Sequence, residues 1–173
     1  MPTIMCTKDL WKVLGAPSPL VARERCDLHD TLLGAWSAKA ITFSEGDFVV
    51  AVNELTYLGL VVPLSPIPRL LSEFGHSVGS LLQALGYDDD LVRSEAEPFL
   101  LHTAFAKNSN RSLIGTLNDL CIHVDAAFQA EKTIDRAALL RVQMHLSEIP
   151  HVNRDCAFPR EAAELLFSEA ANA

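Results

Sequence analysis

The chain has 173 residues, of which 49% are hydrophobic and 21% are charged, and its formal net charge is −8 at pH 7. This length and composition predict one globular domain, with a core large enough to need neither disulfide nor metal. The acidic balance disfavours general binding to nucleic acid or to an anionic membrane surface, because both depend on Lys and Arg.

The N-terminal segment Met1–Trp11 lacks the apolar region of a signal peptide, and the longest apolar run, Leu58–Leu64, has the length of a strand. We therefore expect a soluble cytoplasmic protein that does not enter a membrane. We also expect all of its cysteines to be reduced. The cysteines are spread along the chain without a C-x-x-C pair, at Cys6, Cys26, Cys121 and Cys156.

The N-terminal part of the chain begins with a short predicted strand, Thr3–Cys6. A helix is predicted over Lys8–Leu14, with Thr7 as its N-cap and Gly15 as its end. The segment Val21–Leu33 mixes charged residues with isolated leucines, and its pattern fits either a partly helical excursion or a loop.

A three-stranded meander is the clearest β signal. Strands Ala35–Phe43 and Phe48–Asn53 flank Ser44–Asp47, whose residues are typical of a tight turn, so they predict a hairpin. Tyr57–Pro63 follows as a third strand. Its centre is apolar on both faces, which indicates a central strand.

Helical periodicity dominates the rest of the chain. Leucines and other apolar residues recur at helical spacing over Arg69–Leu85 and over Arg111–Glu131. Between these helices, the carboxylates of Asp88–Asp90 open a short helix, and Phe99–Ala106 is predicted to be a fourth strand. Beyond them we expect two helices flanking an extended segment, at Arg136–Ser147, His151–Phe158 and Pro159–Ala170.

Strands followed by helices predict the α+β class, with an antiparallel sheet of about four to five strands and helices packed mainly on one face. We expect residues 1–173 to form a single domain. Its core spans about residues 3–124, and a helical extension spans about residues 133–170.

Motifs of known chemistry are missing from the sequence. It contains no P-loop, no G-x-G-x-x-G, no nucleophile elbow and no pair of histidines at metal-binding spacing. The carboxylates of Asp88–Asp90 are explained by the helix that they open. We therefore predict no metal and no cofactor, and the sequence identifies no catalytic residue.

The most informative segment runs from Lys107 to Asp119, where a polar loop enters an apolar helix. A helix N-terminus carries unpaired N–H groups and partial positive charge, and Lys107 and Arg111 add formal charge there. Together with Asn110, Ser112 and Asn118, these residues could hold a phosphate or a carboxylate. In the alternative interpretation, Asn110 or Ser112 only caps the helix. Arg111 then pairs with a carboxylate such as Asp119, and Gly115 allows close packing on the sheet.

Two further residues complete the candidate surface. Trp36 lies on the first hairpin strand, and its ring could stack on a ligand or belong to the core, of which we favour the core. Asn53 ends the second strand, where capping a turn is favoured over binding.

These residues also carry a resemblance to an uncharacterised bacterial family of small proteins, whose domain is also attached to some plasmid-encoded proteins. Its pattern opens with C-T-K, matched by Cys6–Lys8. A hairpin strand with W-H-A-N follows, and Trp36–Lys39 stands there, with Ser37 in place of histidine and Lys39 in place of asparagine. The second hairpin strand of the pattern ends in an asparagine, matched by Asn53. Finally, K-T-N-S-R-S-x-x-G-x-x-N-D matches the residues Lys107, Arg111, Ser112, Gly115, Asn118 and Asp119.

The resemblance covers roughly residues 3–124 and implies a fold and a shared surface rather than a reaction. If the histidine and asparagine of the hairpin strand are catalytic in relatives, this chain lacks that pair. Our leading hypothesis is a small non-catalytic binding or regulatory module, whose partner is a protein or a small anionic ligand. The alternatives are an enzyme acting on a phosphorylated or nucleotide-like substrate at the same site, and an acidic, antitoxin-like protein that neutralises a basic partner. The oligomeric state does not follow from the sequence.

Overall fold

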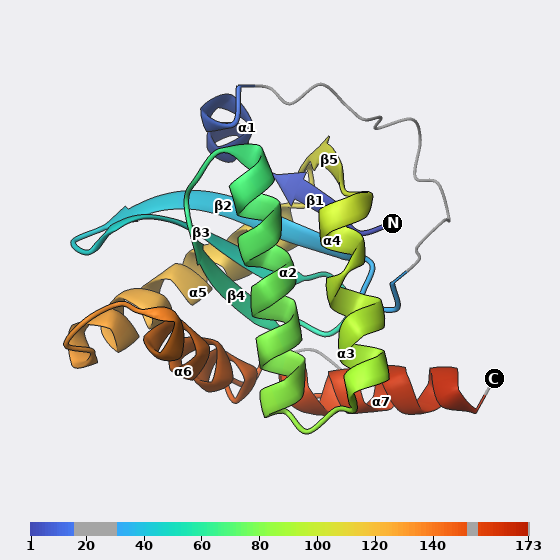
Figure 1. The fold of residues 1–173 in the computed structure, drawn as a ribbon. Coiled ribbons are helices and arrows are strands. Elements are labelled where there is room, and N and C mark those ends of the chain that lie inside the picture. Colours follow the sequence, from blue (N-terminus) through green and yellow to red (C-terminus); the bar gives the residue numbers. More distant parts are fainter. Residues whose placement is uncertain (16–30, 152–155, 173) are drawn as a thin grey trace.

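The computed structural model describes residues 1–15, 31–151 and 156–172. Five strands and seven helices are present in these residues (Figure 1). In chain order they are β1 Thr3–Cys6, α1 Lys8–Val13, β2 Ala35–Phe43, β3 Gly46–Asn53, β4 Gly59–Pro63, α2 Ile67–Ala84, α3 Asp89–Ala96, α4 Pro98–Leu101, β5 Ala104–Lys107, α5 Arg111–Ala130, α6 Arg136–Ser147 and α7 Pro159–Ala171. The α+β class is confirmed.

The five strands form one mixed sheet in the order β4-β3-β2-β1-β5. The predicted meander is present, since β3 pairs antiparallel with both β2 and β4. However, β1 lies parallel to both β2 and β5, so the expectation of an antiparallel sheet is wrong for that half. Parallel neighbours need long crossovers, and the partners of β1 come about 30 and about 100 residues after it. A local sequence pattern cannot predict pairing between strands that are so far apart in the chain.

The sheet is covered on both faces. Along β3, Val49 and Ala51 belong to a core with α1, α2 and α7, whereas Val50 and Val52 belong to a second core with α5 and α6. The first face also carries α3 and α4, which pack beside α2 (Figure 1). Most of the helices therefore lie on one face of the sheet, as predicted, but α5 and α6 cover the opposite face.

The predicted fourth strand is only half correct. Pro98–Leu101 forms the short helix α4, and β5 begins at Ala104. Pro98 occupies the start of that helix, a position that suits its fixed φ. Phe99 is buried and stacks on Phe74 of α2, with 5.8 Å between ring centroids. Packing against α2 thus decides the conformation of a segment whose residues also suit a strand.

The two long helices match their apolar stripes. Leu70, Phe74 and Val78 of α2 and Leu113 and Leu117 of α5 are buried, as their spacing predicts. Most of Val21–Leu33 and part of His151–Phe158 lie outside the described residues, as does Cys26. None of the helices in the described ranges combines the length and the apolar character needed to cross a membrane.

Candidate functional site

The site lies where β1 and β5 end side by side. Cys6, the last residue of β1, stands opposite Lys107 of β5 on one side and Ala38 of β2 on the other. From here the chain leaves β1 into α1 on one face and leaves β5 into α5 on the other. Two parallel strands whose following helices diverge form a switch point, the place where open α/β sheets bind ligands.

Four cationic residues belong to this end of the sheet, and we call them the cationic corner: Lys8, Lys39, Lys107 and Arg111. They are divided between its two faces, since Lys107 contacts α1 and Lys39 contacts α5. Lys8 begins α1, Lys107 ends β5, and Arg111 begins α5. Lys39 is the residue of β2 that follows Ala38, the partner of Cys6. The ammonium of Lys107 lies 5.5 Å from the centre of the Trp11 ring, a cation–π contact that joins β5 to α1.

Asn108 positions the loop that carries Arg111. Its N–H donates to the Cys6 carbonyl at 2.7 Å, and its Oδ1 accepts from the Asn110 N–H at 2.8 Å. Its Nδ2 donates to Ser37 Oγ at 2.9 Å, and Ser37 in turn donates to Glu54 at 2.7 Å. These bonds fix the turn between β5 and α5, so the start of α5 is held against the sheet.

Lys39 reaches the same helix from the sheet. Its Nζ donates to Asn118 Oδ1 at 2.7 Å. Two positions of the hairpin-strand pattern, 37 and 39, therefore contact Asn108 and Asn118 in the loop–helix segment, 71 and 79 residues later in the chain. The fold therefore brings these distant motif positions together at one end of the strands.

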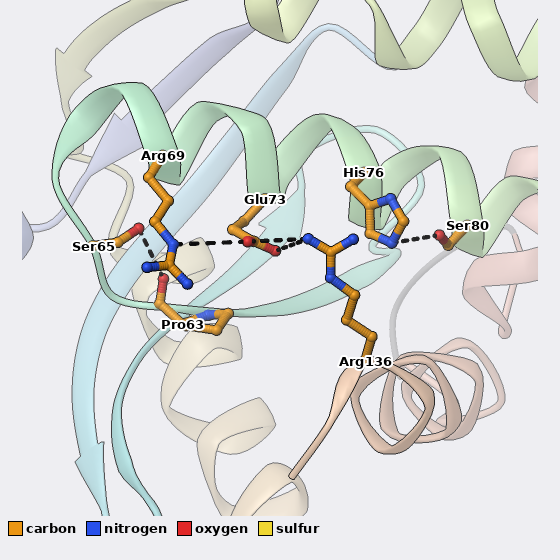
Figure 2. Close-up of polar contacts among 7 residues, drawn as sticks. All are labelled: Pro63, Ser65, Arg69, Glu73, His76, Ser80 and Arg136. Atoms are coloured by element: carbon orange, nitrogen blue, oxygen red, sulfur yellow. Dashed lines mark hydrogen bonds and ion pairs between the residues drawn. The ribbon is translucent and has the colours of Figure 1, made fainter.

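Arg111 differs from the other arginines that the structure describes. Each of those five lies within 4.0 Å of a glutamate carboxylate. Figure 2 shows one example, in which Glu73 lies between Arg69 and Arg136 and joins α2 to α6. Arg111 is exposed and has no carboxylate partner among the described residues, so the alternative in which Asp119 neutralises it does not hold.

The N–H groups at the start of α5 are largely occupied. Asn110 caps the helix, and its Oδ1 accepts from the N–H groups of Ser112 at 3.1 Å and Leu113 at 3.3 Å. The capping interpretation is therefore correct for Asn110. A ligand at this helix start would meet mainly side chains and the helix dipole. Gly115 has nothing within 4 Å of an added Cβ, so it is not needed for close packing.

Thr7 places a buried hydroxyl at the end of β1. It stands at the N-cap of α1, as predicted, but its side chain makes no capping hydrogen bond. The residue is 8% exposed, and its Oγ1 is buried with no hydrogen-bond partner in the described part of the chain. Cys6, the residue before it, faces the α1–α2 core. A buried hydroxyl without a partner costs free energy, and its burial keeps it out of reach of a ligand at the surface.

The remaining two candidates lie inside the protein. Trp36 is 1% exposed and belongs to the core, as favoured. Asn53 is fully buried, and its Oδ1 accepts from the N–H groups of Leu55 and Thr56, which caps the turn between β3 and β4. Neither side chain can contact a ligand at the surface.

Sequence reasoning missed the residues that build the corner around Arg111. Lys39 and Ser37 were noticed only as departures from a pattern, and Thr7, Lys8 and Asn108 were not considered part of the site. One local signal was available, because Asn108-Ser109-Asn110 can form consecutive side-chain-to-backbone turns. The parallel placement of β1 beside β5 had no local signal.

Comparison with known proteins agrees with the predicted family. No curated protein and no solved structure matches this chain. One family model matches residues 3–162, which include the whole sheet, the corner, α6 and the start of α7. The chain belongs to the family described as a domain of unknown function, DUF6933.

Proposed function

We propose that the protein is a non-catalytic binding module, whose ligand presents an anionic group at the cationic corner. The observation that carries this function is Arg111. It is held at the start of α5 by the Asn108 turn, and among the described residues it lacks the carboxylate partner that every other described arginine has. In a chain of net charge −8, an arginine without a carboxylate partner, on the helix that Lys39 also contacts, is a local exception.

The chemistry of the corner suits a phosphate or a carboxylate. The guanidinium of Arg111 can bind either group through two parallel hydrogen bonds, and the lysines add point charges. The positive end of the α5 dipole favours an anion at the same place. A phosphorylated or nucleotide-like molecule satisfies these groups as well as an acidic protein segment does.

Inorganic phosphate is the first probe. The thermal unfolding of the protein is followed in phosphate and in chloride at equal ionic strength. A ligand present at ten times its Kd stabilises by about 1.4 kcal/mol, which raises the Tm of a chain of this size by about 3–6 °C. We expect such a shift for the wild type. It should disappear in R111A, whose own free energy of unfolding should change by less than about 0.5 kcal/mol.

Lys132→Ala is the matched control. Lys132 is exposed and has no carboxylate partner among the described residues, and it follows α5 rather than preceding it. K132A removes one positive charge and should keep the phosphate shift. An equal loss of the shift in R111A and K132A would mean that phosphate acts through net charge alone, and the proposed site would be wrong.

We also infer a cytoplasmic location. The three cysteines of the described residues, Cys6, Cys121 and Cys156, are free. Free thiols in this number are usual in a reducing compartment.

A further inference from the structure

The outer half of β2 has a strand on one side only. β1 pairs with Ala35–Ala38 of β2, and the chain then turns away at Thr7 into α1. From Lys39 to Phe43, β2 pairs with β3 but meets no strand on its other side within residues 1–15, 31–151 and 156–172. The hairpin extends past β1 in Figure 1. In the part of the chain that the structure describes, a strand edge of about five residues is therefore open.

The backbone groups at this edge belong to Ala40 and Thr42. The Ala38 carbonyl accepts from the Thr7 N–H at 2.9 Å, so Ala38 points toward β1. Backbone groups alternate along a strand, so Ala40 and Thr42 point the same way. Their outward N–H and C=O groups have no partner among the described residues, which is the condition for pairing with an added strand.

A groove runs along this open edge. It has a volume of about 490 Å³ and lies between β2 and α5. Apolar atoms line most of it, and Ile122 at its rim is 69% exposed. The principal residues lining it are Lys39, Ile41, Phe43, Cys121, Ile122 and Asp125. A strand added to β2 would direct alternate side chains into this groove, as in known peptide recognition by strand addition.

The two ends of the groove carry opposite charges. Lys39 stands at the end next to the cationic corner, and Asp125 stands at the other end, beyond Cys121 on α5. An occupant is therefore complementary when its acidic end lies at Lys39 and its basic end at Asp125.

The end of β1 limits how far the occupant can continue. A strand added at Lys39–Phe43 lies in line with β1, because both would use the same edge of β2. The added chain meets β1 at Thr7 and cannot continue along the sheet. A chain terminus fits there better than an internal segment. Since the corner is cationic, the terminus that fits is a carboxylate.

We propose that the open edge of β2 binds the extended C-terminal segment of a partner protein, antiparallel to β2, with its terminal carboxylate at the cationic corner. In this arrangement, which rests on the binding function proposed above, Lys39 and Arg111 receive the carboxylate. Ala40 and Thr42 supply the backbone pairing. The groove holds alternate apolar side chains, and residues toward the partner's interior lie near Asp125.

The test uses a library of random heptapeptides displayed at the free C-terminus of a carrier protein, selected on the full chain. Recovered sequences are resynthesised, and their affinity is measured by fluorescence polarisation. We expect apolar or β-branched residues at alternate positions. Converting the terminal carboxylate to an amide should weaken binding about tenfold or more, because charge-assisted hydrogen bonds are lost.

Thr42→Pro and Thr42→Val form a matched pair. Both remove the hydroxyl that donates to Asp47 at 2.6 Å, but only the proline removes the outward N–H. T42P should abolish peptide binding, and T42V should retain it. Ile122→Glu acts from the helix side and should also weaken binding. The phosphate-induced rise in Tm should survive in T42P, which shows that this variant is folded.

Each other outcome is decisive. No enrichment of peptides, or peptides that bind T42P as well as T42V, would overturn the inference and leave the phosphate result standing. A phosphate shift that fails while carboxylate-dependent peptide binding succeeds would overturn the small-anion site alone. A dimer of the wild type in analytical ultracentrifugation that T42P dissociates would assign the edge to a second copy of the chain, contradicting the proposed partner.

Discussion

Glu95 of α3 fixes the segment that leads into β2. Its Oε1 accepts from the Leu32 N–H at 2.7 Å, and its Oε2 accepts from the Leu33 N–H at 3.1 Å. The side chain is 1% exposed, and Leu33 belongs to the core. Burial raises the pKa of this carboxyl above its ordinary value of 4.5, although the two N–H groups and the charged N-terminus pull it down.

Glu95→Ala should destabilise the protein strongly. The substitution leaves the buried Leu33 N–H and the partly buried Leu32 N–H without this acceptor, and an unsatisfied buried group costs about 1–3 kcal/mol. Removing the desolvated carboxyl recovers part of this cost. We expect the free energy of unfolding to fall by about 3 kcal/mol, which corresponds to a decrease in Tm of about 6–12 °C for a chain of this size.

Glu95→Gln separates the charge from the hydrogen bonds. Because the pKa is raised in the folded state, the folded protein favours the protonated carboxyl. That contribution to stability is complete below the unfolded-state pKa of 4.5 and is lost as pH rises through the raised value. Glutamine does not titrate. The stability advantage of the wild type over E95Q should therefore decrease as pH increases from about 4 to about 7.

Urea unfolding across this pH range is the appropriate assay, with equal m-values as the check that the unfolding transition is unchanged. Glu97→Gln is the control, since Glu97 is exposed just after α3 and its one ion pair within the described residues is with Arg93, at 3.6 Å. An advantage of the wild type over E95Q that grows with pH would refute the reasoning. It would mean that the two N–H groups outweigh burial and hold the carboxyl ionised.

Three further predictions follow from the packing and the thiols. Gly75→Ala should destabilise by about 1–3 kcal/mol in urea unfolding, because its Cβ would lie 2.9 Å from the Ala96 carbonyl, whereas Gly115→Ala, with open space around it, should stabilise by about 0.5–1 kcal/mol; equal effects would contradict this packing. Gln143→Leu should cost about 1–3 kcal/mol, because Gln143 is buried and its Oε1 accepts from the Val61 N–H at 3.2 Å on edge strand β4; a neutral result would show that this N–H finds another acceptor. In thiol titration of the folded protein, Cys156 should react before Cys6 and Cys121, because burial raises the pKa of Cys6 to about 12 and also raises that of Cys121; all four cysteines should titrate as free thiols once the protein is unfolded without reductant, and two or fewer would contradict the prediction of reduced cysteines.

The sequence by itself determined the elements whose signals are local. The apolar stripes of α2 and α5, the turn between β2 and β3, and the capping position of Asn110 are set by residues within one or two helical turns or one hairpin of each other. Side-chain periodicity and turn chemistry act over such distances, so these elements could be recognised without the fold. The strand predicted from Phe99 was wrong over Pro98–Leu101, because contact with α2 overrode an ambiguous local pattern.

Only the tertiary structure decided where the site lies. β1 joins β2 and β5 across long crossovers, and that pairing brings Lys107 and Thr7 to one edge with Lys39. Whether Arg111 has a carboxylate partner depends on which side chains surround it in space, and the sequence left pairing with a carboxylate such as Asp119 open as an alternative. The open edge of β2 also exists only because β1 ends after four residues beside a nine-residue strand. Pairing between distant segments is fixed by burial of the whole sheet, and no short stretch of sequence encodes it.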